Sequence, residues 1–157
     1  MTGSLPEKAM YAIRDMGEAD ISFIFSSLLR SYEEVAVEKL RISVSVYYRG
    51  HHDLLMRVLE RGQCLMACDP EDPDQIYGYV LYASDDHGQP PCLHYLYVKG
   101  SFRRAGIGSA LLRASGLLEE IGPVAYSHEK PDFSKYLLKY FRRRTVYDPY
   151  RFFSYGT

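Results

Sequence analysis

The sequence predicts an α/β fold in which a mixed β-sheet carries helices on both of its faces. Segments with the strand-like and helix-like spacing of apolar residues alternate along the chain in the order β-α-α-β-β-β-α-β-α-β. The chain has 157 residues, of which 46% are hydrophobic and 25% charged, as is typical of one soluble globular domain. We therefore expect a single domain that spans residues 1–157.

The first part of the chain predicts one strand followed by two helices. Residues 10–14 are expected to form the strand. In residues 21–30 the apolar side chains recur at the spacing of one helical face, at positions 21, 24, 25, 28 and 29. A second helix is expected at about 46–61, ending at Gly62, whereas residues 31–45 favour no single element.

The remainder predicts a β-hairpin and then further strands and helices in alternation. Strands at 63–68 and 76–82 flank a turn that contains two prolines and four acidic residues. A strand at 92–98 leads through a basic turn into a helix that ends at about Glu120. The last expected elements are a strand at 124–128, a helix at 133–141 and a strand at 145–147.

The basic turn after the strand at 92–98 predicts a phosphate site. Arg103 and Arg104 supply positive charge, while Gly106 and Gly108 let an anion approach the N–H groups that have no partner at the start of a helix. The glycine spacing fits neither the dinucleotide fingerprint nor the P-loop. An ordinary basic turn that caps a core helix is the alternative.

The pattern Arg103-x-x-Gly106-x-Gly108 resembles the pyrophosphate loop of the GNAT N-acetyltransferase superfamily, and the C-terminal region is similar to that of small bacteriophage acetyltransferases. The order of elements is also that of the GNAT fold. The resemblance implies a mostly antiparallel sheet with a splayed central strand pair, and acetyl-CoA as the cofactor. It implies that main-chain groups of Leu96 and Val98 pair with the pantetheine, and that the pyrophosphate is bound by Arg103, Arg104, Gly106, Gly108 and Ser109.

The resemblance further implies direct attack of an amine on the thioester, which needs a base for the amine and an acid for the leaving thiolate. His94 is the candidate base, because histidine has an ordinary pKa of about 6.5, and its side chain is expected to alternate with those of its strand neighbours. His128 is the alternative base. Tyr140 is the candidate acid, in a segment that matches the superfamily's Tyr-x-x-x-Gly-Phe only in part, and Tyr136, one turn earlier, is its rival. Core packing is the alternative role for each of them.

Tyr126, Ser127 and Tyr150 border the expected acceptor pocket and are the candidates for binding a small-molecule or protein amine, whereas Phe152 and Phe153 are expected to pack in the core. Residues 1–98 carry 8 Lys and Arg against 15 Asp and Glu, and residues 99–157 carry 11 against 5. This basic second half, which includes the run at 142–144, suits coenzyme A and also a nucleic acid. Acyl transfer to a base amine of a nucleic acid is therefore the second hypothesis, and a catalytically silent acyl-CoA-binding module is the third.

The sequence favours neither a membrane segment, a metal site nor a disulfide. No run of 18 apolar residues occurs and the first eight residues lack the apolar region of a signal peptide, so a cytoplasmic protein is expected. Cys64 and Cys68 are too far apart along one strand to form a disulfide, and the three cysteines are expected to be reduced and buried. Their spacing offers no zinc ligands. We expect a monomer or a homodimer.

Overall fold

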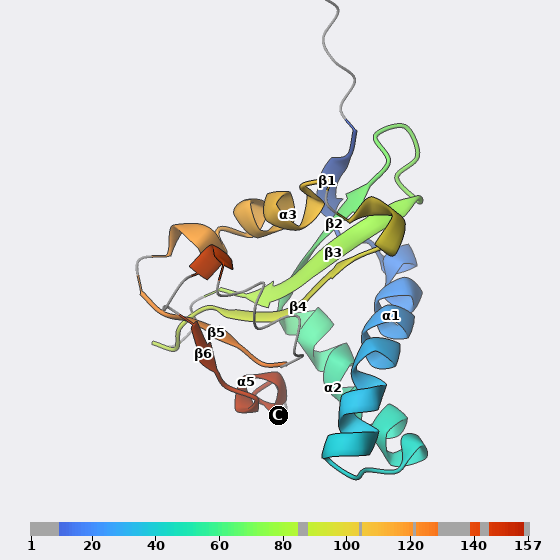
Figure 1. Cartoon of the computed structure of the whole chain (residues 1–157), viewed down its shortest axis with the longest axis vertical. Coiled ribbons are helices and arrows are strands. Elements are labelled where there is room, and N and C mark those ends of the chain that lie inside the picture. Colours follow the sequence, from blue (N-terminus) through green and yellow to red (C-terminus); the bar gives the residue numbers. More distant parts are fainter. Residues whose placement is uncertain are drawn as a thin grey trace, which may run out of the picture.

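The computed structural model describes residues 10–84, 88–103, 105–120, 122–128, 139–141 and 145–155. These residues form a six-stranded sheet in the order β1-β2-β3-β4-β5-β6 (Figure 1). The strands are β1 (Ala12–Asp15), β2 (Gln63–Cys68), β3 (Ile76–Ala83), β4 (Cys92–Val98), β5 (Val124–Tyr126) and β6 (Thr145–Tyr147). The helices are α1 (Ile21–Glu34), α2 (Val44–Arg61), α3 (Ile107–Ser115) and α5 (Tyr150–Phe153). The predicted α/β fold class is confirmed.

The sheet is mixed, and most of its residues are paired antiparallel. Strands β1 to β4 are antiparallel neighbours, whereas β5 runs parallel to both β4 and β6. The antiparallel neighbours are joined by short or helical connections, while the parallel step from β4 to β5 contains α3, as a parallel pair requires a long crossover. This crossover carries the predicted phosphate turn from the end of β4 to the start of α3.

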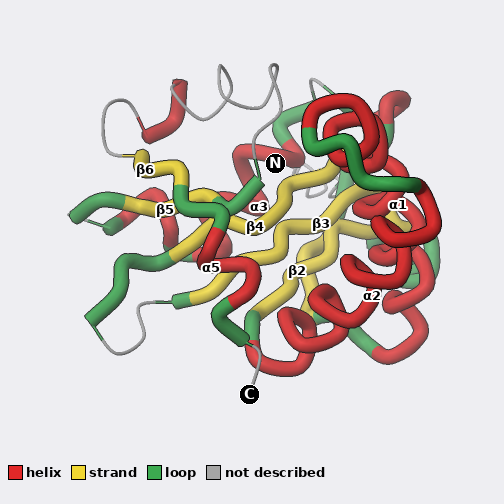
Figure 2. The backbone as a smooth tube through the Cα atoms, turned by 90° about the horizontal axis from the view of Figure 1, so that it is seen from below, coloured by secondary structure: helices red, strands yellow, loops and turns green. Residues whose placement is uncertain are grey.

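Helices cover both faces of the sheet, as predicted. Helices α1 and α2 lie side by side over one face and α3 lies over the other (Figures 1 and 2). Strand β3 is buried along its whole length, and its side chains alternate between the hydrophobic cores on the two faces of the sheet. Tyr79 and Leu81 pack toward α1 and α2, whereas Val80 and Tyr82 pack in the cluster that includes α3.

Several element boundaries differ from the sequence prediction. Helix α1 reaches Glu34 and continues as a π-helical segment, Val35–Lys39, so much of the region that favoured no element is helical. Helix α3 ends at Ser115, because Gly116 adopts the left-handed conformation with φ 79° and a 3-10 turn follows. Strand β5 ends at Tyr126, two residues before its predicted end. Helix α5 was not predicted, and of the helix expected at 133–141 only residues 139–141 are described, which are helical.

The cysteines match their predicted environment. Cys64, Cys68 and Cys92 are free and buried. Burial raises the pKa of the Cys64 and Cys92 thiols to about 12, so both are uncharged at neutral pH. Within the described parts of the chain, none of the helices has the length and apolar character needed to cross a membrane.

Candidate functional site

The central strands β4 and β5 part soon after they meet. Among the described residues, two pairs join them, Cys92 with Ala125 and Leu93 with Tyr126. The Ser127 backbone N–H then donates to the Leu93 carbonyl at 3.2 Å, while β4 continues to Val98. Leu96 and Val98, the predicted partners of pantetheine, therefore lie on the part of β4 beyond its last paired residue with β5. This geometry is the splayed strand pair that the sequence resemblance implied.

A β-bulge at His94 marks the point where the two strands part. Tyr95 pairs with Leu81 and Leu93 pairs with Tyr82, so His94 is the extra residue on β4. A bulge breaks the alternation of side chains and re-aims the extra one. The expected simple alternation of His94 with its neighbours is therefore wrong: its ring contacts Phe152, which packs in the same core cluster as Tyr95.

The predicted phosphate turn leads into the start of α3. Gly106 is the residue before the helix, exposed and left-handed at φ 80°, and no described atom outside its chain neighbours and the helix backbone lies within 4 Å of the position that a Cβ would take. The first helical hydrogen bond runs from the Ala110 N–H to the Gly106 carbonyl at 3.0 Å. The N–H groups before Ala110, including those of Gly108 and Ser109, therefore precede the first bond of the helix and can bind an anion.

The two arginines predicted at this turn are placed differently. The Arg103 side chain is exposed, and its Nε donates to the Val98 carbonyl at 3.1 Å, which holds the guanidinium beside the end of β4. Arg104 lies outside the described residues, as do the rival acid Tyr136 and the basic run at 142–144.

The predicted acid lies at the predicted phosphate turn. The Tyr140 hydroxyl is hydrogen-bonded to Ser109 Oγ, although the two residues are 31 positions apart in the sequence. Tyr140 is half-buried, and the Lys139 ammonium lies 5.8 Å from the centroid of its ring. The Tyr140 hydroxyl therefore lies beside the first turn of α3.

The predicted base belongs to a buried chain of hydrogen bonds. His94 is 0% exposed and both of its ring nitrogens are engaged. Its Nδ1 lies 2.8 Å from Ser127 Oγ and its Nε2 lies 2.7 Å from the Tyr155 hydroxyl. Ser127 Oγ also lies 2.9 Å from Nδ1 of His128. The structure thus brings His94, Ser127 and His128 together and adds Tyr155, which the sequence analysis did not identify.

The histidines of this region are neutral at pH 7. Burial, followed by the charges of His128 and Arg151, holds the pKa of His94 well below its ordinary value. Burial and the neighbouring His51 lower the pKa of His128 to about 3, and burial lowers the pKa of His51 to about 4. A neutral imidazole has one nitrogen that can accept a proton, and the lowered pKa values make these rings weaker bases than an exposed histidine.

Aromatic side chains enclose this histidine cluster. The Phe152 ring lies 4.4 Å from the His128 ring, 5.8 Å from that of His94 and 5.7 Å from that of His51. The Tyr32 ring covers His128 at 4.7 Å. Phe152 is buried, as predicted, but Phe153 is 51% exposed, because consecutive residues of α5 point in different directions.

The candidate acceptor residues have three different environments. Ser127 is buried within the hydrogen-bond chain. Tyr126 is half-buried, with its ring 5.3 Å from that of Tyr147. Tyr150 is 79% exposed at the start of α5, so its side chain lies at the surface and outside the buried cluster.

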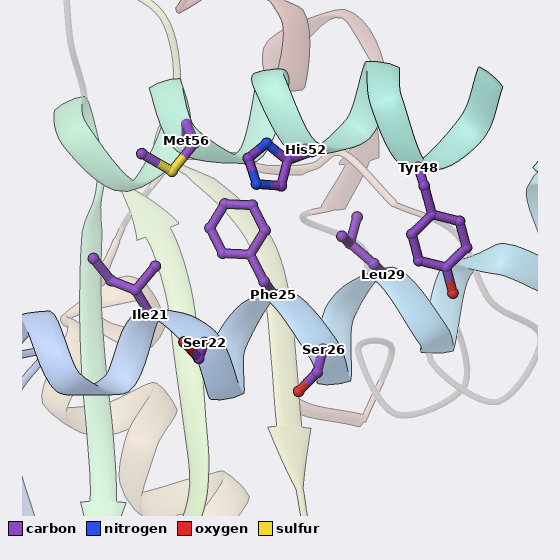
Figure 3. A pocket seen from close by; sticks show the side chains of 8 residues that line it. All are labelled: Ile21, Ser22, Phe25, Ser26, Leu29, Tyr48, His52 and Met56. Carbon is purple, nitrogen blue, oxygen red and sulfur yellow. The ribbon is translucent and has the colours of Figure 1, made fainter. Parts of the chain in front are cut away.

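A groove of about 430 Å³ lies between α1 and α2 (Figure 3). Its lining is mainly apolar, and the ring of His52 rests 4.6 Å from that of Phe25. None of its lining side chains belongs to the histidine cluster, so the groove is separate from the candidate site. It is lined by Ile21, Ser22, Phe25, Ser26, Leu29, Tyr48, His52 and Met56.

Comparisons with known proteins agree with the geometry. The family model described as "Acetyltransferase (GNAT) family" matches residues 24–115. A chain from Pyrococcus furiosus, described as a candidate acetyl transferase, has a TM-score of 0.56 at 22% identity, covering 87% of this chain and 95% of its own. A Corynebacterium glutamicum chain described as "histone acetyltransferase HPA2 and related acetyltransferase" has a TM-score of 0.53 at 16% identity, covering 83% of each chain. Among curated protein sequences, none matches.

Proposed function

Because the chain belongs to the GNAT acetyltransferase family, we propose that it moves the acetyl group of acetyl-CoA to an amine by direct attack of the amine on the thioester. Membership of this family makes it an N-acetyltransferase that uses acetyl-CoA. One observation carries the finer proposal: β4 and β5 part at His94, so that a neutral histidine lies at the point where the gap between the two strands begins. Crevices at strand ends are where open α/β sheets bind ligands.

The residues of the phosphate turn fit the cofactor. The start of α3 offers N–H groups, the exposed Gly106 leaves their approach open, and Arg103 adds positive charge beside Val98. We assign the pyrophosphate to Arg103, Arg104, Gly106, Gly108 and Ser109, and the pantetheine to the main chain at Leu96 and Val98. When bound, acetyl-CoA supplies the thioester carbon that the amine attacks and the thiol that leaves.

His94 and Tyr140 divide the proton transfers between them. We assign to His94 the role of base: it is uncharged at neutral pH, as a base must be, although its lowered pKa makes it a weaker base than an exposed histidine. We assign the donation of a proton to the leaving thiolate to Tyr140, whose hydroxyl is bonded to Ser109 at the start of α3. His128 contacts the site through Ser127, so it supports His94 within one hydrogen-bond chain.

We assign acceptor binding to residues at the end of β5 and at the start of α5. Tyr126 and Tyr150 are the aromatic candidates for holding an acceptor, since Tyr126 is half-buried at the end of β5 and Tyr150 is exposed on α5. Ser127 is their buried neighbour and is already bonded to His94. We propose that these residues bind a small-molecule or protein amine. Turnover with nucleic acid in the test below would instead indicate a base amine as the acceptor.

The test combines cofactor binding with turnover. Calorimetric titration with acetyl-CoA measures binding, and release of free thiol is followed over a panel of small amines, peptides with lysine side chains, and single- and double-stranded nucleic acids. Binding with turnover on one class supports the proposal and identifies the acceptor. Binding without turnover on every class favours a silent acyl-CoA-binding module, and the absence of binding refutes the assigned cofactor site.

Gly108→Glu provides the site-specific check. A carboxylate at the start of α3 adds bulk and repels the pyrophosphate, so acetyl-CoA binding should weaken by about 3 kcal/mol, or more than about 100-fold in Kd. Ala114→Glu is the matched control, because it adds the same charge to an exposed position near the other end of α3. Equal affinities of the two variants would show that the turn does not bind the cofactor.

A further inference from the structure

Four side chains from three separate regions of the chain form one unbroken line of hydrogen bonds. The line runs from Tyr155, after α5, through His94 on β4 and Ser127 after β5 to His128. The three joining distances are 2.7, 2.8 and 2.9 Å, all within the range of good hydrogen bonds. His94 uses both of its ring nitrogens, and the Ser127 hydroxyl contacts both histidines. The line of hydrogen bonds is therefore continuous.

The donors and acceptors along this line can be arranged in two complete ways. In one arrangement Tyr155 donates to Nε2 of His94, whose Nδ1–H donates to Ser127, which donates to Nδ1 of His128. In the other arrangement every donor and acceptor is reversed. A line of groups that satisfies both arrangements can pass a proton from one end to the other without moving a heavy atom.

The line opens toward the surface at one of its four members. His94, Ser127 and His128 are 0%, 3% and 4% exposed, whereas Tyr155 keeps partial exposure. Phe152 and Tyr32 pack against the rings of the two histidines, Phe152 against both and Tyr32 against His128. An amine therefore cannot reach either nitrogen of His94 directly, since one is bonded to buried Ser127 and the other to Tyr155.

We infer that Tyr155 is the catalytic residue that takes the proton from the amine and hands its own hydroxyl proton to Nε2 of His94. The inference rests on the proposed acetyl transfer. As the amine nitrogen forms its bond to the acetyl carbon, its proton moves to the Tyr155 oxygen and the Tyr155 proton moves to His94. The carbon–sulfur bond breaks, the thiolate takes the proton of Tyr140, and water returns a proton to Tyr140 and removes one from His94 through Tyr155.

Ser127 and His128 have a supporting part in this step. When His94 gains a proton at Nε2, its Nδ1–H still donates to Ser127 Oγ, and Ser127 can donate to His128. The hydrogen bond that Ser127 accepts from protonated His94 partly offsets the cost of a buried positive charge, because hydrogen bonds to the charged form stabilise it. The Phe152 ring lies beside both histidines, and the Tyr32 ring lies beside His128.

The test is a double-mutant cycle with Tyr155→Phe and His94→Gln, measured as kcat at saturating acetyl-CoA with the best amine of the panel. Each single variant should lose about 100-fold in kcat, and the double variant should be no slower than the slower single one, because the two groups act on one proton. Acetyl-CoA affinity should stay at the wild-type value in all three. Tyr48→Phe is the matched control, since it also removes a tyrosine hydroxyl, the one that is bonded to Glu33 at 3.0 Å on α1.

Tyr155→His distinguishes proton transfer by Tyr155 from a role in packing alone. A histidine at this position can exchange protons, so it should recover part of the activity that Tyr155→Phe loses, with a changed pH profile. Wild-type kcat in Tyr155→Phe would overturn the inference, and so would losses that multiply in the double variant. These results refute only the role of Tyr155, because they require a wild-type protein that acetylates an amine. If the wild-type protein acetylates no amine, the proposed function itself fails.

Discussion

The buried histidines should make the free energy of unfolding fall as the pH is lowered from about 7.5 to about 5. Burial lowers the folded-state pKa of His51 to about 4 and that of His128 to about 3, whereas an unfolded chain binds the same protons at about 6.5. Below the unfolded value the unfolded state therefore holds more protons than the native state. The stabilisation is complete above pH 6.5 and is lost progressively as the pH falls through the range between the unfolded and folded pKa values.

The size of the effect follows from this difference. Each such histidine contributes a slope of up to about 1.4 kcal/mol per pH unit below pH 6.5, which amounts to about 2 kcal/mol at pH 5. His51 and His128 together give a loss of up to about 4 kcal/mol, and His94 acts in the same direction. Native domains have free energies of unfolding of about 5–15 kcal/mol, so this loss is large. Asp20 does not contribute here, because its pKa is lowered from 3.8 by its hydrogen bond to Arg14.

Urea unfolding at a series of pH values measures this loss. The variant His51→Leu removes one of the titrating rings and should reduce the drop between about pH 7.5 and pH 5 by about 2 kcal/mol. The matched control is His52→Leu, the adjacent histidine, whose side chain is 58% exposed. A free energy of unfolding that does not change over this range in the wild-type protein would refute the reasoning, as would equal slopes in the wild-type protein and His51→Leu.

Two further predictions concern turnover. His94→Ala should fold and bind acetyl-CoA as the wild-type protein does, but should lose about 100-fold or more in kcat and change the acidic limb of the pH–rate profile. Full activity with an unchanged profile would exclude His94 as the base and leave His128 to be tested. Tyr140→Phe should keep the acetyl-CoA affinity and lower kcat by about 100-fold, with the loss smallest on the alkaline limb, where a tyrosine acid has already lost its proton, while Ser109→Ala, which keeps the Tyr140 hydroxyl, should lose less. Steady-state thiol release decides both cases, and equal kcat values for Tyr140→Phe and the wild-type protein would show that another group protonates the thiolate.

The fold was largely predictable from local sequence signals. The apolar spacing in α1 placed Ile24, Phe25, Leu28 and Leu29 on one face, and all four are buried. Strands β2 and β4 have the predicted bounds, because prolines, glycines and acidic residues mark the turns beside them. The predicted end of α3, at about Glu120, lies beyond the observed end at Ser115. The sequence alone does not show that Gly116 adopts the left-handed conformation that ends the helix.

The candidate site was predictable only where its signal is contiguous. The turn from Arg103 to Ser109 is one short motif, so residue types and spacing were enough to indicate it. The contact of Tyr155 with His94 joins residues 61 positions apart, and one tyrosine among 15 carries no local signal of such a role. The bulge at His94 was also missed, since it depends on the register with β3, which a single strand sequence does not show.

The bulge on β4 also has a consequence for a shortened chain. Because His94 is the extra residue, a deletion of position 94 would leave Leu93 and Tyr95 adjacent and opposite Tyr82 and Leu81, in one regular ladder. The shortened strand would keep every cross-strand partner that it now has on β3, and the bulge that lies where β4 and β5 part would be gone. Such a chain should fold with a flatter, more continuous sheet and have no opening for a ligand. The extra residue at position 94 is thus expected to determine where β4 parts from β5.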